Sequence, residues 1–227
     1  INQKNLFGRG QILSLEGQIG GRTTTYKLSF TEPWLFDIPL SAGFDLYNWE
    51  TDYDTYEKAS VGGGVRFSYP IFDFTRGYIR YNYEAADITN VYEFAAQSIK
   101  DLEGTNITSS VSATITYDSK NKAFNPTDGS KHSMTVKYAG LGGNIAFTKY
   151  VAETGWYFPL FKGTVGFLHG KGGYVIEGSG GILPDYERFY LGGINSLRGY
   201  EWQEVHVLDE DGNTIGETSS YSLMLNT

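Results

Sequence analysis

The amino-acid sequence predicts an all-β protein, an antiparallel transmembrane β-barrel of about ten strands. Apolar and polar residues alternate with a period of two along most of the 227 residues, as they do in strands with two different faces. Many of the expected strands exceed about ten residues, whereas the usual strand has about five or six. Their polar faces carry charged residues in mid-strand, which suits a water-filled lumen. The same alternation with its apolar side turned inward would describe a soluble barrel or sandwich, which is the alternative.

The expected strands follow one another along the chain. The first begins near Arg9 without an earlier partner, and the last starts shortly before Thr227. The clearest alternation sets Ile107, Val111 and Ile115 against serines and threonines. In order, the strands are expected at 9–20, 22–32, 39–52, 56–69, 74–89, 106–118, 130–140, 144–159, 163–178 and 218–227.

The connections differ between the two rims of this barrel. One rim has longer and more variable loops, above all 90–106, where a helical turn is expected at 91–96, and 179–217. The other rim has short turns that carry proline, which ends a strand because it lacks an N–H donor; they lie at 32–39, 69–72, 125–129 and 158–161. This asymmetry is typical of outer-membrane barrels. Aromatic residues gather where strands end, as in an interfacial girdle: Trp34, Phe36, Tyr69, Phe72, Trp156, Tyr157, Phe158 and Phe161.

Composition excludes several classes of protein. The net charge of −8 argues against a nucleic-acid partner, because no basic stripe is available to neutralise phosphates. The chain has no Cys, which excludes a disulfide scaffold and thiolate metal sites. No apolar run reaches the roughly 18–20 residues of a membrane helix. The abundance of Gly and Tyr, 29 and 18 residues, suits a large antiparallel sheet.

Enzymatic chemistry finds no support in the sequence. His132, His169 and His206 lie in different segments without metal-ligand spacing, and we interpret them as ordinary polar-face or loop residues. Ser179 and Ser196 do not sit in a Gly-x-Ser-x-Gly motif. The acidic run at 209–212 is better explained as a hairpin tip than as a calcium loop. We therefore expect no catalytic residues, no metal and no cofactor.

Charged residues on the polar faces are expected to pair across the lumen wall. The carboxylates concerned are Asp45, Glu84 and Glu153, and neighbouring strands would have to align them to make a carboxylate pair. Salt bridges are the simpler account; the expected cations are Lys27, Lys58, Arg66, Arg80, Lys137 and Lys149.

Several motifs together resemble the barrel domain of the BamA-type family of outer-membrane β-barrel assembly proteins. Leu197-Arg198-Gly199-Tyr200 is similar to the Val/Leu-Arg-Gly-Phe/Tyr signature of that family, and Phe189-Tyr190-Leu191-Gly192-Gly193 resembles the approach to it. Asn125-Pro126-Thr127-Asp128-Gly129 looks like the short inner-rim turn of the family. The early strand–turn patterns at 5–10 and 31–36 also match, so the resemblance covers essentially the whole chain.

The resemblance implies a sixteen-stranded barrel, of which this chain would hold the part from the end of the second strand to the start of the twelfth. The periplasmic POTRA domains of the family are expected to lie outside this chain. The loop 179–217 is expected to fold into the lumen, where Arg198 would pair with carboxylates beyond Thr227. Leu197 and Tyr200 would pack beside Arg198, and the glycines Gly192, Gly193 and Gly199 would permit a tight path.

The function implied by the resemblance is that of an insertase. Such a protein assists the folding and insertion of other β-barrel proteins in the outer membrane of a Gram-negative bacterium, without ATP or cofactor. Its partners would be unfolded outer-membrane protein clients, the lipid bilayer and accessory lipoproteins of an assembly complex. A two-partner-secretion or TamA-type translocation pore of the same superfamily is the alternative.

Overall fold

The computed structural model describes residues 1–95, 97–189, 199–200, 207–208, 214–216 and 221–226. The helical elements are η1 (Leu35–Asp37), α1 (Gln97–Lys100) and η2 (Asp185–Glu187). The strands are β1 (Asn2–Leu6), β2 (Gln11–Ile19), β3 (Thr23–Glu32), β4 (Ser41–Asp52), β5 (Glu57–Phe72), β6 (Thr75–Thr89), β7 (Gly104–Asp118), β8 (Gly129–Gly143), β9 (Phe147–Pro159), β10 (Val165–Glu177), β11 (Val207–Leu208), β12 (Thr214–Gly216) and β13 (Tyr221–Asn226).

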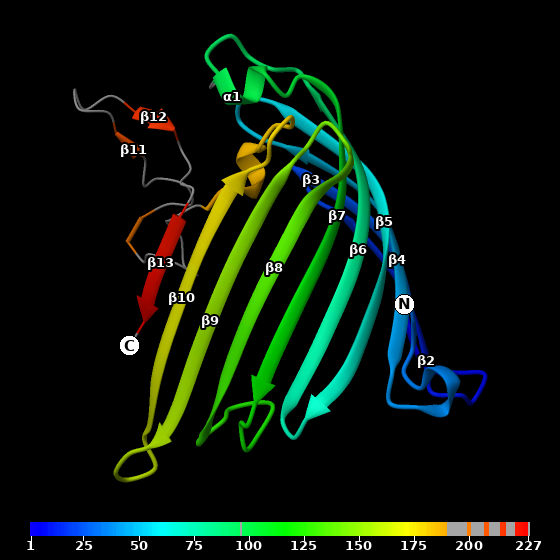
Figure 1. Cartoon of the computed structure of the whole chain (residues 1–227), viewed down its shortest axis with the longest axis vertical. Coiled ribbons are helices and arrows are strands. Elements are labelled where there is room, and N and C mark those ends of the chain that lie inside the picture. Colours follow the sequence, from blue (N-terminus) through cyan, green and yellow to red (C-terminus); the bar gives the residue numbers. More distant parts are fainter. Residues whose placement is uncertain (96, 190–198, 201–206, 209–213, 217–220, 227) are drawn as a thin grey trace.

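Eleven strands form one curved antiparallel sheet in the order β1 to β10 and then β13. Each of these strands therefore pairs with its predecessor in the sheet, while β11 and β12 pair with each other (Figure 1). The two longest connections, 90–103 and the segment after β10, lie at one end of the sheet, which we call the longer-loop end; the turns after β3, β5, β7 and β9 lie at the other, which we call the short-turn end (Figure 1). The predicted all-β antiparallel barrel architecture is confirmed, whereas the total of sixteen strands stays a prediction.

The strand β1 corrects the expectation that the strand near Arg9 has no earlier partner. Asn2 lies opposite Ser14 and Lys4 opposite Ile12, so β1 pairs with β2 through its backbone. Its sequence, Asn-Gln-Lys-Asn-Leu, is polar and shows no alternation, and four of its five residues are exposed. Periodicity therefore gave no signal for it.

The helical turn expected at 91–96 is misplaced. The helix α1 begins at Gln97, and Ile99 together with Leu102 just after it points into an apolar cluster. Burial of these two side chains, three positions apart, sets the position of the helix. Among the described residues, no helix is long and apolar enough to cross a bilayer.

The strand register gives the sheet two chemically different faces. On the convex face, Phe30 lies opposite Phe44, which lies opposite Val65, and Val65 lies opposite Tyr81. Residues one position away in each strand point to the concave face; they include Ser29, Asp45 and Arg80. Because the side-chain period is two, the polar residues in the middle of β3 to β6 fall on the same, concave side.

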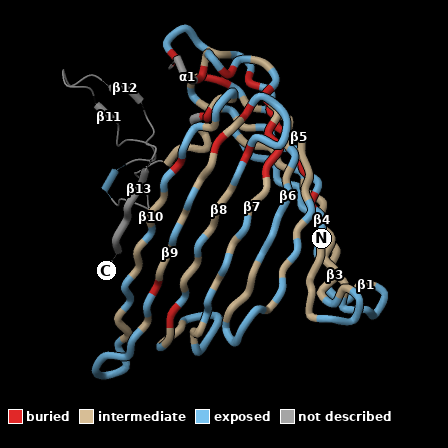
Figure 2. Tube along the Cα trace, viewed as in Figure 1, coloured by how far each residue is buried: buried red, intermediate tan, exposed pale blue. Residues whose placement is uncertain are grey.

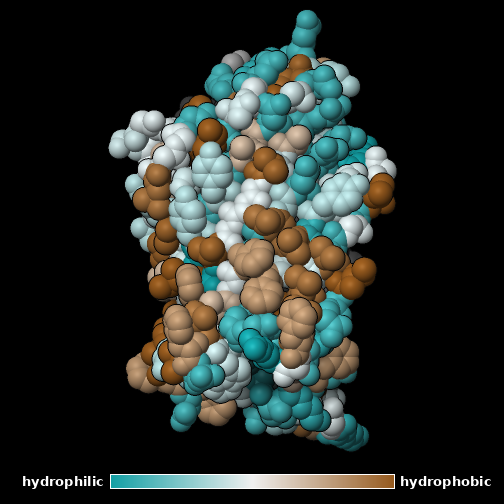
Figure 3. Space-filling model, turned by 90° about the vertical axis from the view of Figure 1, so that its right-hand side faces the viewer, coloured by the Kyte–Doolittle hydropathy of each residue, from teal (hydrophilic) through white to brown (hydrophobic). Residues whose placement is uncertain are grey.

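Apolar side chains are exposed on the convex face rather than buried. Leu46, Val61 and Ile79 expose 52%, 56% and 58% of their surface. Buried residues concentrate near the end of the sheet that carries the longer loops (Figure 2). Figure 3 shows hydrophobic residues in a band across the middle of the outer surface, with hydrophilic residues at both ends. A band of this kind is stable in contact with lipid, so we treat the strands as membrane-spanning.

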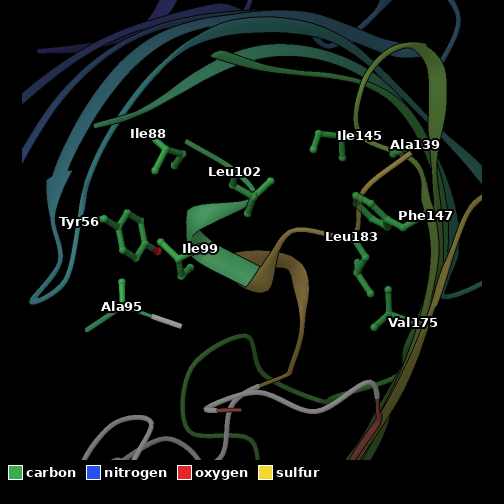
Figure 4. Packing of buried hydrophobic residues seen from close by; sticks show 10 residues of the cluster. All are labelled: Tyr56, Ile88, Ala95, Ile99, Leu102, Ala139, Ile145, Phe147, Val175 and Leu183. Atoms are coloured by element: carbon green, nitrogen blue, oxygen red, sulfur yellow. The ribbon is translucent and has the colours of Figure 1, made fainter. Parts of the chain in front are cut away.

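A compact apolar cluster closes the longer-loop end of the sheet. It combines strand residues with loop residues on the concave side of the curved sheet (Figure 4). Its members are Tyr56, Ile88, Ala95, Ile99, Leu102, Ala139, Ile145, Phe147, Val175 and Leu183. The cluster fixes the loop 90–103 and the start of the loop after β10 against the wall, which determines where that second loop enters the lumen.

Candidate functional site

The segment that follows β10 enters the lumen and reaches three strands. Residues 185–187 form the short helix η2, which lies inside the curve of the sheet (Figure 4). Tyr186, Glu187 and Phe189 contact Lys58 in β5, Lys137 in β8 and Lys149 in β9. We call this set of contacts the lumenal docking site.

Glu187 is the centre of the lumenal docking site. Its carboxylate accepts a hydrogen bond of 2.6 Å from the Lys137 ammonium and one of 3.3 Å from the Lys149 ammonium. Lys149 also donates to the Glu187 backbone carbonyl at 2.7 Å. Lys137 and Lys149 lie directly opposite each other in the β8–β9 ladder, where two like charges destabilise the pair. The Glu187 carboxylate offsets the repulsion between the two ammonium groups. The two lysines therefore form a binding site for an acidic residue of the loop.

The electrostatics of Glu187 predict how docking depends on pH. Burial by itself raises the pKa of the Glu187 carboxyl, but the ammonium groups of Lys137 and Lys149 outweigh burial and lower that pKa below its usual value. A lowered pKa stabilises docking above the free value of about 4.3, and this stabilisation is lost as the pH falls through the docked value.

We therefore expect docking to persist at pH 5–7 and to weaken only below about pH 4. An environment-sensitive dye on a Ser179→Cys variant reports the transition, since the chain has no other Cys. The transition should disappear in a Glu187→Gln background. A midpoint above about pH 5 would contradict the lowered pKa.

Tyr186 adds an aromatic contact next to the carboxylate. The Lys58 ammonium lies 3.5 Å from the centre of the Tyr186 ring, a cation–π geometry, and is 3.4 Å from the Glu84 carboxylate. Burial, with the nearby charges of Glu84 and Glu187, raises the pKa of the Tyr186 phenol. The ring therefore stays neutral and retains its attraction for Lys58.

Phe189 fills a space that the sequence leaves open by placing glycine in β10. A Cβ at Gly173 would collide with the Phe189 ring, and the Lys149 ammonium lies 4.9 Å from the centre of that ring. The absence of a side chain at Gly173 therefore leaves the space that the Phe189 ring of the loop occupies.

Gly173→Ala is expected to dislodge the docked segment while the sheet stays intact, because the ring is the mobile partner. Proteolysis of 179–189 should accelerate several-fold in native membranes. Gly155→Ala in the adjacent strand is the matched control, since its added Cβ comes no closer than 3.4 Å to a neighbouring atom, on Phe167. Equal rates of proteolysis in the two variants would show that Phe189 does not depend on the space above Gly173.

Ion pairs line the rest of the concave face. The Asp45 carboxylate pairs with Arg66 and Arg80 and accepts a hydrogen bond of 2.6 Å from Ser29. The Tyr47 hydroxyl accepts a hydrogen bond from the Asn82 amide at 2.8 Å and donates to Glu84 at 2.9 Å. The expected pairing of wall carboxylates with wall cations is therefore present.

Lys27 and Glu153 also depart from the expected pairing, in addition to Lys137 and Lys149, which pair with the loop residue Glu187. Lys27 lines two hollows on the concave face and makes no ion pair among the described residues. Glu153 pairs with His169 at 2.9 Å rather than with a lysine or arginine. Asp45, Glu84 and Glu153 therefore each have their own partners, and no two of them form a carboxylate pair.

The histidines require one correction. His169 lies on the polar face, but His132 lies on the convex face, where its ring stacks with Tyr117 at 5.8 Å and meets Trp156 at 4.7 Å. Its ring nitrogens are satisfied by the hydroxyls of Thr154 and Ser130, which lets a polar ring join an aromatic belt. His206 lies outside the described residues. Within the described ranges, no group of His, Asp and Glu residues suits a metal ion.

The motif residues after the docked segment fall mostly outside the described residues. Gly192, Gly193, Leu197 and Arg198 are among them, so the lumenal anchor at Arg198 stays a prediction. Gly199 has a positive φ of 94°, a conformation that suits glycine. Tyr200 is about half-exposed at 51%.

Asn121, which the sequence analysis did not single out, makes several of the hydrogen bonds of the inner-rim turn. The Asn121 carbonyl accepts hydrogen bonds from the backbone N–H groups of Thr127 and Asp128, at 3.1 and 3.3 Å. Its amide donates to the Thr127 hydroxyl at 2.7 Å, and the Asp128 carboxylate accepts from Gly129 N–H at 2.8 Å. Pro126 precedes these residues, and Gly129 opens β8 with a φ of 99°.

Asn121→Ala is expected to loosen the inner-rim turn by about 1 kcal/mol, because it removes hydrogen bonds of an exposed turn and water becomes the partner of the two backbone donors. Hydrogen exchange at Thr127 and Asp128 should accelerate accordingly. Asn121→Asp keeps the acceptor and loses only the donor, so its effect should be intermediate. Unchanged exchange in Asn121→Ala would mean that Pro126 and Gly129 suffice to hold the turn.

Sequence reasoning singled out Arg198 and did not single out Tyr186 or Glu187. In the contacts that the structure describes, the loop residue Glu187 supplies the acid, and Lys137 and Lys149 of the wall supply the cations. An available signal was the position of Lys137 and Lys149 on the polar faces of neighbouring strands, which left two like charges without a wall carboxylate.

The comparisons with known proteins agree with this architecture. The model of the Omp85 superfamily domain matches residues 5–224. The "outer membrane protein assembly factor BamA" of Nitratidesulfovibrio vulgaris is 34% identical over 95% of this chain and 28% of that protein. The protein of the same name from Neisseria meningitidis is 30% identical over 95% of this chain and 30% of its own length. A SAM50-like protein of Drosophila melanogaster is 27% identical over 87% of the chain and 47% of that protein.

A solved structure supports the fold. The crystal structure of BamA from Haemophilus ducreyi lacking POTRA domains 1–3 superposes with a TM-score of 0.84, at 20% identity, over 98% of this chain and 47% of that chain. The chain spans less than a third of the length of the two BamA relatives. From the match of the family model across nearly all of its residues, the chain belongs to the Omp85 superfamily.

Proposed function

We propose that this chain is part of an outer-membrane insertase that assists the folding and membrane insertion of β-barrel proteins. The observation that carries the proposal is the similarity along nearly the whole chain to proteins named outer membrane protein assembly factor, at 34% and 30% identity. The curved sheet with an apolar outer band and a loop docked in its lumen is consistent with it.

The physical basis of the activity is the backbone of the client. Each unpaired N–H or C=O group in lipid costs several kcal/mol, so a strand enters the bilayer only when its backbone finds partners. A sheet edge that offers those partners lowers the cost during insertion. This action makes and breaks hydrogen bonds only, and it requires neither ATP nor a cofactor.

The lumenal docking site has a definite role in this proposal. Tyr186 and Glu187 tie the loop after β10 to β5, β8 and β9 and thereby brace this part of the wall. A braced wall leaves deformation to other parts of the barrel. Glu187, Lys137 and Lys149 are therefore positioning residues.

The partners follow from the same proposal. The clients are unfolded outer-membrane proteins, and the lipid bilayer surrounds the barrel. Accessory lipoproteins complete an assembly complex. We place the protein in the outer membrane of a Gram-negative bacterium, supported by the higher identity to the bacterial relatives than to the animal ones. The two-partner-secretion or TamA-type pore is less well supported, because the relatives above are named for assembly.

The test is a folding assay with the full-length protein in liposomes. A chaperone-held unfolded porin is added, and protease-resistant barrel is followed over time. We expect acceleration over empty liposomes, and a loss of acceleration in Glu187→Gln and in Arg198→Ala. No acceleration by the wild-type protein, together with steady ion conductance or export of one dedicated protein, would replace the insertase with the pore.

A further inference from the structure

A row of aromatic rings crosses the convex face just above the short turns. Phe74 and Tyr117 lie 6.2 Å apart, Tyr117 and His132 5.8 Å, and His132 and Trp156 4.7 Å between ring centres. These residues belong to the β5–β6 turn, β7, β8 and β9, so the row spans four neighbouring elements. Rings with a polar edge favour the boundary between lipid tails and headgroups, which places this boundary at the row.

An apolar groove runs along the convex face next to this row. It has a volume of about 490 Å³ and lies over β5 to β8. Gly77 and Ala113 leave it open between the larger side chains of Ile71, Ile115 and Met134. The pair Ile115–Met134 is the next pair on the same face as the row pair Tyr117–His132, one step away from the turn between β7 and β8. The groove therefore continues the path from the boundary into the hydrocarbon region.

Two lysines lie on the other side of the aromatic row, in neighbouring turns. Lys122 belongs to the turn between β7 and β8, and Lys162 to the turn between β9 and β10 (Figure 1). Both are exposed, and neither forms an ion pair within the described ranges. Phe124 and Phe161 in the same turns expose 83% and 75% of their surface. Basic and aromatic residues at a bilayer surface favour contact with anionic headgroups.

The net charge of the whole chain does not attract anionic headgroups. Its net charge is −8, so the protein as a whole repels anions. Acidic residues lie at both rims: Asp52, Asp54, Asp87, Glu93 and Glu103 at the longer-loop end, and Asp73, Asp118 and Asp128 at the short-turn end, where Asp118 pairs with Lys120 at 3.6 Å. Attraction for an anion must therefore come from the local lysines.

We propose that the groove, the aromatic row and the two lysines form a binding site for an anionic phospholipid of the short-turn leaflet. The headgroup phosphate lies at Lys122 and Lys162, the ester region lies at the row from Phe74 to Trp156, and one acyl chain lies in the groove over Ala113. The site faces away from the lumen, so it is separate from the lumenal docking site and does not depend on the proposed function.

The headgroup is tested by native mass spectrometry of the full-length protein. The protein is taken from micelles that contain equal amounts of phosphatidylglycerol and phosphatidylcholine with the same acyl chains. We expect preferential retention of phosphatidylglycerol, which falls toward parity in the double variant Lys122→Gln/Lys162→Gln, by roughly fivefold per lysine. The matched control Arg22→Gln/Lys100→Gln removes the same charge from the opposite rim and should keep the preference.

Clear outcomes overturn the proposal. Equal retention of the two lipids by the wild-type protein would exclude an anionic lipid and leave the exposed turns as a surface for a protein. A preference that persists in the double variant, or is lost equally in the control, would remove the two lysines from the site.

The groove has its own test. Ala113→Leu fills the groove on the lipid-facing side, where a larger apolar residue leaves the fold intact, and folding is verified by heat-dependent gel migration. Retention of both lipids should fall by a similar factor while their ratio is unchanged. If retention of both lipids stays at the wild-type level, the acyl chain does not lie in this groove.

Discussion

Replacing Glu187 by glutamine is expected to release the loop after β10 from the lumen wall. The substitution leaves the ammonium groups of Lys137 and Lys149 facing each other without a counter-charge. Loss of one partner from a buried, hydrogen-bonded charge pair costs about 2–5 kcal/mol, and the Glu187 side chain is only 18% exposed. A cost of this size shifts the docking equilibrium by at least about thirtyfold.

Trypsin cleavage after Arg188 measures the release, because this bond lies at the docked segment and cleavage follows the population of the open form. We expect cleavage at least tenfold faster in Glu187→Gln than in wild type. Glu153→Gln is the matched control, since the Glu153 carboxylate also makes a lumenal contact, a hydrogen bond of 2.9 Å with His169, but belongs to the wall itself. Equal cleavage of Glu187→Gln and wild type would show that the ion pairs do not hold the loop.

The second large effect is expected at Asp45. Its side chain is almost fully buried and pairs with two guanidinium groups, those of Arg66 and Arg80. Asp45→Asn leaves both cations on one wall without a partner, and breaking a buried pair in this way costs about 3–5 kcal/mol. Because Arg66 and Arg80 are 32% and 46% exposed, water offsets part of this cost, and we expect the lower end of the range.

Urea unfolding in micelles, followed by tryptophan fluorescence, gives the free energy of unfolding. Asp54→Asn removes a carboxylate from the pair with Arg22, in which both side chains are more than 70% exposed, so its effect should be close to zero. Adding Arg80→Gln to Asp45→Asn should recover part of the loss, because one stranded cation is removed. If Asp45→Asn unfolds at the same urea concentration as Asp54→Asn, the two arginines do not depend on Asp45.

The faces of the strands could be predicted from the sequence because a strand alternates its side chains with a period of two. Ile107, Val111 and Ile115 were separable from Ser112 and Thr114 without coordinates. The long strands and charged polar faces then distinguished a lipid-facing surface from a soluble core. The short strand β1 escaped this reasoning, because its five residues are almost all polar and show no alternation. The helix α1 was misplaced because burial, rather than local pattern, sets its start.

The sequence by itself determined the architecture, the two rims and the chemistry of each face, since these depend on residues that are near one another in the chain. Only the tertiary structure decided which charges meet. Lys137 and Glu187 are 50 positions apart, and the 26 positions between Lys58 and Glu84 cross from β5 to β6. Such partners depend on the register of the strands and on the path of a loop. A shift of one residue would turn either lysine toward lipid, and the register is decided by the whole sheet.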